Sequence, residues 1–275
     1  MIARPVWPPS RRSRLALAVV MVAFAALFDV VIALTIATTS QNWLPDFKVY
    51  FAAGERLAAG RSLYLPEQLA GPFHAICEGC YLYPPPFAQL IAPLTGVPLG
   101  LAATAGFLLI LAVSWYSVWL ATGIGGAPRT LERAAWSFVA VSYFLPPINA
   151  AFNGNVGTVL GLLVVLVALG GAVSGVSAAL ATLLKVSPGP LVLVALAAGR
   201  RSAVSVVVTL LVVTAVSFVL SPQDWLDYPT VLLNMIAGDG DIGTNVALVE
   251  VASRSGVEGV GLTAVHVAIL MAGLA

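Results

Sequence analysis

Long apolar runs are the feature that most restricts what this chain can fold into. The first run, 15–39, contains one charged residue, Asp29, and further runs follow at 86–97, 100–122, 134–148, 156–172, 176–198, 203–220 and 259–275. A helix needs about 20 apolar residues to span a bilayer core of about 30 Å, whereas barrel strands are about 10 residues long and alternate in polarity. The runs therefore predict an all-α polytopic membrane protein, a single domain over 1–275 with about seven to eight transmembrane helices.

The composition excludes the other broad classes of protein. Hydrophobic residues make up 60% of the chain and charged residues 9%, whereas charged residues make up about 25% of soluble domains. The net charge is +1, and the chain has no basic stripe of the kind that binds nucleic acid. We therefore expect membrane lipids, and no nucleic acid, among its partners.

The basic residues orient the chain in the membrane. Four arginines precede the first apolar run: Arg4, Arg11, Arg12 and Arg14. Because basic residues stay on the cytoplasmic side, residues 1–14 are predicted to be cytoplasmic and residues 40–86 to form the first extracytoplasmic loop. The first run is longer than the core of a signal peptide, about 7–15 residues, which predicts a retained anchor. A second outer loop is predicted at 221–258, where Arg254 is the one basic residue.

The second run, 86–97, is too short to span a bilayer alone. It either extends through 81–85 and crosses, or it forms a re-entrant hairpin. We favour the crossing, because it places the dense pair Arg200 and Arg201 on the cytoplasmic side. Arg129 and Arg133 then lie outside, beside Glu132.

The polar segment 40–86 concentrates side chains that could take part in catalysis, since it holds seven of the 25 charged residues and both cysteines. An amphipathic surface helix is predicted at 46–59, with an apolar flank that includes Phe47, Tyr50 and Phe51. Asp46 begins this helix just above the membrane, where a partly desolvated carboxylate could act as a general base. Aspartate is also a favoured helix N-cap, so the sequence leaves both interpretations open.

Lys185 is the one lysine inside an apolar run, and it directly precedes the break Ser187-Pro188-Gly189-Pro190. A buried lysine is costly in a membrane and normally faces a partner or a cavity. It could hold a phosphate together with backbone groups freed by the broken helix. Alternatively, it could form a buried ion pair with Asp29 in the first run.

Three further patterns have a structural and a functional interpretation. His74 precedes the pair Cys77 and Cys80 and could suggest zinc, but only His266 could add a fourth ligand, so a local disulfide or two thiols are favoured and no metal site is predicted. Asn153-Gly154-Asn155 is typical of a turn. The aromatic residues at the presumed interfaces are typical of an aromatic belt, with sugar stacking as the alternative: Trp43, Tyr50, Tyr64, Tyr81, Tyr83, Trp225 and Tyr228.

The order of several short motifs resembles glycosyltransferase family 87. The match begins with Asp46-Phe47-Lys48-Val49-Tyr50-Phe51, continues with Leu57-Ala58-Ala59-Gly60-Arg61-Ser62-Leu63-Tyr64, and reaches Tyr83-Pro84-Pro85-Pro86 before Ala92-Pro93-Leu94. Gly154-Asn155-Val156-Gly157 resembles the family's Gly-Gln-x-Asn element, and Leu184-Lys185-Val186-Ser187-Pro188 with Arg200-Arg201 resembles its Lys-Pro-x-Pro segment and basic turn. Asn245, followed by Arg254, resembles its Asn-Gln-Ser region.

This resemblance implies a GT-C membrane fold and transfer of a hexose, in particular mannose, from a polyprenyl-phosphate donor to a cell-envelope glycan or glycolipid. The site would lie on the outer face of a bacterial plasma membrane, with no cofactor. Asp46 would be the catalytic residue and Lys185 would lie near the lipid phosphate. The other implied substrate-binding residues are Tyr50, Tyr83, Asn155 and Asn245.

Two alternatives remain at the level of sequence. The interrupted sixth run and its buried lysine could belong to a transporter or lipid flippase, although no inverted repeat is evident. The last run stops at Ala275 before any flanking polar residue, which could indicate an inactive, shortened homologue of a longer protein.

Overall fold

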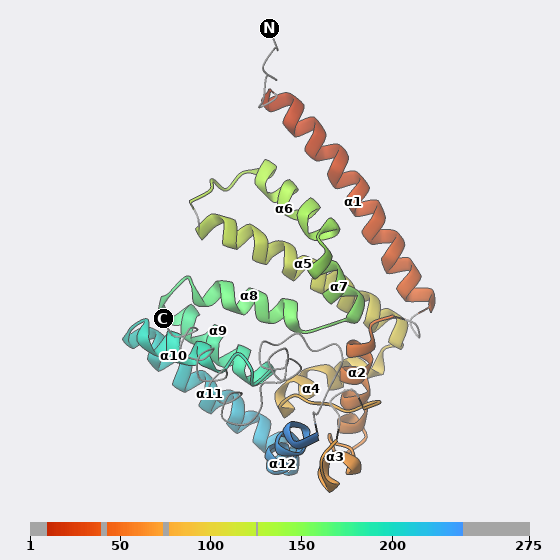
Figure 1. Cartoon of the computed structure of the whole chain (residues 1–275), viewed down its shortest axis with the longest axis vertical. Coiled ribbons are helices and arrows are strands. Elements are labelled where there is room, and N and C mark those ends of the chain that lie inside the picture. The colour runs from red at the N-terminus through yellow and green to blue at the C-terminus, as the bar shows by residue number, and fades with distance from the viewer. Residues whose placement is uncertain (1–9, 40–42, 74–76, 125, 239–275) are drawn as a thin grey trace, which may run out of the picture.

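The structure confirms the all-α class. The computed structural model describes residues 10–39, 43–73, 77–124 and 126–238, and within them it contains twelve α-helices, one 3-10 helix and no strand (Figure 1). Three helices are long and apolar enough to cross a membrane: α1 (Arg11–Thr39), α5 (Leu99–Ile124) and α11 (Arg200–Leu220). Along α1 large apolar side chains face outward, with Phe24 and Leu34 61% and 62% exposed, as expected of side chains in contact with lipid. The chain is a multi-pass membrane protein.

The remaining apolar runs form shorter helices. α6 (Leu131–Tyr143) and α7 (Leu145–Asn153) meet at 62° and make a fourth span if they are taken together. Pro146 and Pro147 lie at this bend, where proline cannot continue the helical hydrogen bonds. The next three helices are α8 (Gly157–Val167), α9 (Gly171–Leu184) and α10 (Pro190–Ala197). The described residues thus hold three or four full spans plus short helices, where the runs predicted seven to eight transmembrane helices.

The sixth apolar run forms two helices that run in opposite directions. α9 and α11 lie side by side and start at the same end of the bundle, because Gly175 faces Ser202, whose carbonyl oxygen would be 2.1 Å from a Cβ at position 175. α10 connects the end of α9 to the start of α11, so it must return along them (Figure 1). The break at 187–190 is therefore the tip of a hairpin, and Lys185 lies at the end of α9.

The arginines that begin or directly precede α1, α6 and α11 gather at one end of the bundle. Arg14 Nε lies 2.9 Å from Glu132 Oε1, which joins the start of α1 to the start of α6. Arg129 and Arg133 stack on Trp119, with their guanidinium carbons 5.8 and 5.1 Å from its ring centroid. The start of α11, with Arg200, lies at the same end (Figure 1).

This arrangement shows that the predicted crossing of the second apolar run is wrong. The run forms α4 (Pro85–Ile91) and the 3-10 helix η2 (Ala92–Gly96), which together extend about 20 Å, less than the bilayer core. α5 therefore starts on the same side as α4, and the loop with Arg129 and Arg133 returns to the side of the N-terminal arginines.

A second layer covers the opposite end of the bundle. It consists of α2 (Pro45–Ala58), α3 (Pro66–Ala70), α4 and α12 (Pro222–Gly238) (Figure 1). The amphipathic surface helix predicted at 46–59 is confirmed as α2. Buried Asp224 accepts a hydrogen bond from Leu63 N at 2.9 Å, and Asn234 Nδ2 donates to Gln68 O at 3.0 Å. These bonds tie α12 to the segment after α2, so the two polar segments of the sequence pack together.

Several aromatic residues expected at an interface form the core of this layer. Tyr64 and Tyr81 are 1% and 0% exposed. The Tyr64 ring lies 6.2 Å from that of Tyr81 and 6.0 Å from that of Tyr228. The aromatic belt is therefore the wrong interpretation for these three residues, which support the second layer from within.

Candidate active site

The first turn of α2 sets the position of Asp46. Leu44 precedes the helix in the left-handed conformation, at φ 54°, and its N–H donates to Phe152 O at 3.0 Å. Phe47 on the inner flank of α2 is buried in a hydrophobic cluster with side chains of α1, α5 and α7. This packing fixes the helix rotation and leaves Asp46 half-buried at the rim.

Asp46 does not cap α2. The residue at the N-cap position is Leu44, and no side chain caps the helix. Instead, Asp46 Oδ2 accepts a hydrogen bond from Nδ2 of Asn155, a residue that lies between α7 and α8. Capping, the structural alternative for Asp46, is therefore not what this carboxylate does.

Two tyrosines line the same cavity as Asp46. Tyr50 OH donates to Tyr83 OH at 3.1 Å, and the two rings meet edge to face with centroids 5.3 Å apart. Burial, reinforced by the neighbouring Tyr83, raises the pKa of Tyr50, and burial likewise raises that of Tyr83. Both phenols therefore remain neutral hydrogen-bonding groups at neutral pH.

Lys185 lies over the second tyrosine of this pair. Its Nζ is 5.6 Å from the centroid of the Tyr83 ring, a distance typical of a cation–π contact. The alternative partner, Asp29, accepts a hydrogen bond from Ser142 Oγ at 2.8 Å. In the part of the chain that the structure describes, the Lys185–Asp29 ion pair is not formed, so the structure does not support that alternative.

A cavity of about 640 Å³ opens beside Asp46. Its polar lining comes from Asp46, Lys48, Tyr50, Glu78 and Tyr83. A volume of this size is within the range of small-molecule binding sites, about 300–1,000 Å³. The cavity can therefore take a polar substrate directly against the Asp46 carboxylate.

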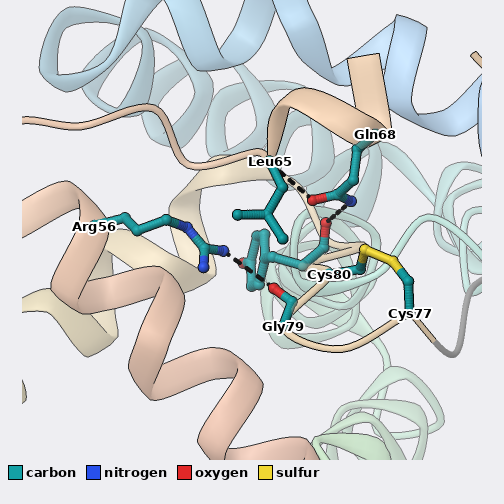
Figure 2. The surroundings of a disulfide bond; sticks show 7 residues. Arg56, Leu65, Gln68, Cys77, Gly79 and Cys80 are labelled. Atoms are coloured by element: carbon teal, nitrogen blue, oxygen red, sulfur yellow. Dashed lines mark hydrogen bonds between the residues drawn. A yellow bond between two sulfur atoms is a disulfide. The ribbon is translucent and has the colours of Figure 1, made fainter. Parts of the chain in front are cut away.

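The far wall of this cavity is held by a short disulfide loop. Cys77 and Cys80 form a disulfide, and Figure 2 shows Arg56 reaching from α2 to the carbonyl of Gly79, at 3.3 Å. Gln68 fixes the segments around the loop by bonding Leu65 N and Tyr81 O, both at 3.0 Å (Figure 2). The local disulfide, one of the two forms favoured for the pair, is confirmed, and a zinc site with these two sulfurs as thiolates is not formed.

The structure brings five of the six predicted site residues into one region: Asp46, Tyr50, Tyr83, Asn155 and Lys185. The sixth, Asn245, lies outside the described residues, as do His74, Arg254 and His266. Among the residues that are described, no three His, Cys, Asp or Glu side chains converge as metal ligands. The assembled groups can accept a proton at Asp46 and attract an anion at Lys185.

The sequence did not reveal two elements of this site. One is the contact between Asp46 and Asn155, which joins residues 109 positions apart. The other is the cavity wall around Glu78 and the disulfide. Only the resemblance of Gly154-Asn155-Val156-Gly157 to a family motif gave a signal for the first.

Comparison with known proteins supports the resemblance. Residues 81–275 match the profile of glycosyltransferase family 87. This segment contains Tyr83, Asn155 and Lys185, whereas Asp46 precedes it. No curated protein and no solved structure matches the chain. The match covers well over half of the sequence, and the expected GT-C superfamily fits this family. The chain therefore belongs to glycosyltransferase family 87 and is a membrane glycosyltransferase.

Proposed function

We propose that this protein is a hexosyltransferase, and specifically a mannosyltransferase, of the bacterial plasma membrane. It transfers the sugar from a polyprenyl-phosphate donor to a cell-envelope glycan or glycolipid on the extracytoplasmic face. The observation that carries the proposal is the hydrogen-bonded pair Tyr50–Tyr83, which lines one cavity together with Asp46 and has Lys185 over its second ring. A proton acceptor and a cation thus lie beside the same buried aromatic pair.

The proposed reaction is a direct displacement. The Asp46 carboxylate takes the proton from an acceptor hydroxyl, whose oxygen forms a bond to the anomeric carbon while the bond from that carbon to the phosphate oxygen breaks. The polyprenyl phosphate leaves with both electrons of the broken bond, and the anomeric configuration inverts. Lys185 offsets the charge that develops on the leaving phosphate. The proposal assigns no step to a metal ion or other cofactor.

The position of Lys185 favours this reaction over transport. The transporter alternative required an interrupted helix with a charge near the middle of the membrane. Lys185 instead lies at the end of α9 against Tyr83, where α9 meets the second layer. This is where a lipid phosphate would be expected, at the boundary between apolar and polar surroundings.

Replacement of Asp46 tests the proposal. Membranes containing the Asp46→Asn protein should transfer label from radiolabelled polyprenyl-phosphate mannose at least about a hundredfold more slowly than wild type, because the general base is lost. Glu55→Gln, which changes an exposed carboxylate on the same helix, should leave the rate unchanged. Equal transfer by Asp46→Asn and wild type would remove Asp46 as the base.

A further inference from the structure

We propose that Asn155 is a positioning residue, which holds and orients the Asp46 carboxylate and is not itself a ligand of the substrate. The inference deepens the proposed function and rests on it for the role of Asp46. It replaces the substrate-binding role that the sequence suggested for Asn155. Both ends of the Asn155 amide make hydrogen bonds within the protein.

The orientation of the Asn155 amide is fixed from its oxygen end. Asn155 Oδ1 accepts a hydrogen bond from Gly157 N at 2.6 Å, at the start of α8. With the oxygen held there, the amide nitrogen must point the other way, and it donates to Asp46 Oδ2. A Cβ at position 157 would lie 2.8 Å from Asn155 Oδ1, so glycine is needed for this geometry.

The backbone on both sides of the contact is also held in place. Gly154 has φ +67°, and a Cβ there would come within 2.6 Å of Phe47 Cβ and 3.1 Å of Leu44 Cβ. The turn before α8 therefore lies directly on the first turn of α2. The bond from Leu44 N to Phe152 O fastens the same two segments a second time. Asp46 and Asn155 thus belong to two backbone segments that cannot move independently.

The Asn155–Asp46 hydrogen bond and the two packed backbone segments that hold it form a clamp. This clamp makes the two carboxylate oxygens of Asp46 unequal. Oδ2 is occupied by Asn155, whereas no donor among the described residues bonds to Oδ1. Asp46 also lines the cavity that can take a substrate. Oδ1 is therefore the oxygen that can receive the proton of an acceptor hydroxyl, and the carboxylate needs no reorientation before it does so.

The experiment follows the Asp46 carboxyl group directly in the purified full-length protein. Its carboxylate stretching bands are recorded by infrared difference spectroscopy at one fixed pH, with Asp46→Asn identifying the signal. Asn155→Ala and Asn155→Asp should both shift these bands, because each change removes the amide donor to Asp46 Oδ2. Asn153→Ala is the matched control and should leave the bands unchanged, since among the described residues the Asn153 side chain bonds to Asn149 in its own helix.

Kinetics on the same variants separate positioning from binding. With radiolabelled polyprenyl-phosphate mannose, Asn155→Ala should lower kcat about tenfold to a hundredfold with little change in KM. Unchanged infrared bands in both Asn155 variants, or a raised KM at constant kcat, would overturn the inference. Asn155→Asp, which keeps the size of the side chain, guards against loss of folding as the explanation. Full transfer by Asp46→Asn would instead reject the proposed function, and the infrared result would still decide the role of Asn155.

Discussion

Lys185 lies at the end of α9 with its ammonium group over the Tyr83 ring. The aromatic ring reduces the free-energy cost of burying the ammonium group, and the positive charge can still attract an anion. The pair it could have formed with Asp29 is replaced by the bond from Ser142 to Asp29. The two intramembrane charges of the sequence therefore serve different parts of the molecule.

Replacement of Lys185 should impair use of the donor. Lys185→Met is expected to raise the donor KM at least about tenfold and to lower kcat, because the phosphate loses its counter-charge. The measurement is the rate of label transfer over a range of donor concentrations. Lys185→Arg should retain part of the activity, and Arg201→Gln, at the opposite end of the bundle, should retain all of it.

A specific outcome would contradict this role for Lys185. If the double variant Lys185→Met with Asp29→Leu recovered the activity that Lys185→Met had lost, the lysine would be a structural partner of Asp29. The bond between Ser142 and Asp29 argues that no such recovery will occur.

At the level of residues, the sequence predicted the chemical groups but not their connections. Lys185 could be named because a lysine within an apolar run is unusual, whereas the position of Asp46 also suited an N-cap and its catalytic role came from the family resemblance. The role of Asn155 could not be predicted, because its side chain meets Asp46 only after α7 has packed on α2. Such a contact depends on the tertiary fold and leaves no local pattern.

At the level of elements, α12 secures the layer that carries the site. Its residue Asp224 is 4% exposed and bonds to Leu63 N. The pKa of Asp224 is raised, mainly by burial, which outweighs the hydrogen bonds from Leu63 and Ser221. The charged form of this carboxylate is thus disfavoured in the folded protein.

The raised pKa of Asp224 gives a pH dependence of stability with a defined sign. Because the folded state binds this proton more tightly than the unfolded state does, the contribution of Asp224 to stability should fall as the pH rises from about 4, the value for an unfolded aspartate, through the folded pKa. Melting of the purified protein at a series of pH values measures it. Asp224→Asn should flatten this part of the profile, whereas Glu55→Gln, which changes an exposed carboxylate on α2, should not. A profile unaffected by Asp224→Asn would contradict the assignment.

The elements also show where sequence patterns are reliable. The run 15–39 and the amphipathic pattern at 46–59 predicted α1 and α2 closely, because a long run or a repeated apolar flank determines a helix by itself. The runs at 86–97 and 176–198 were different. Hydropathy records that a segment is apolar, but it does not record whether a short helix continues across the bundle or turns back.

At the level of the whole molecule, the turns at α4–η2 and at 187–190 place the arginines before α6 and at the start of α11 at the same end as those that begin α1. Neither turn adds a full crossing of the membrane. The N-terminal arginines, the Arg129–Arg133 segment and Arg200 therefore share one side, as the positive-inside rule requires. Asp46 lies at the other end, which supports the proposed outward-facing site.

Cysteine labelling in intact cells tests this arrangement. With a membrane-impermeant maleimide, Ala59→Cys in the second layer should react, whereas Ala127→Cys and Ala198→Cys at the arginine end should react only after the cells are opened. All three positions are exposed in the fold, so a difference in labelling reports the side of the membrane. Labelling of Ala127→Cys from outside would mean that 86–97 crosses after all.

The short helix α4 also constrains the order in which the protein can be assembled. Gln89 Nε2 donates to Ser217 O and Ser221 Oγ, at 2.9 and 2.8 Å, and these partners follow it by 128 and 132 residues. At about 5–20 residues per second, the ribosome needs roughly 6 to 26 seconds to make that length of chain. During this interval α1 is already available for insertion while α4 has no partner on α11. The second layer, which carries Asp46, is thus completed only late in synthesis, and any factor that attends the growing chain must protect an incomplete second layer until α11 is made.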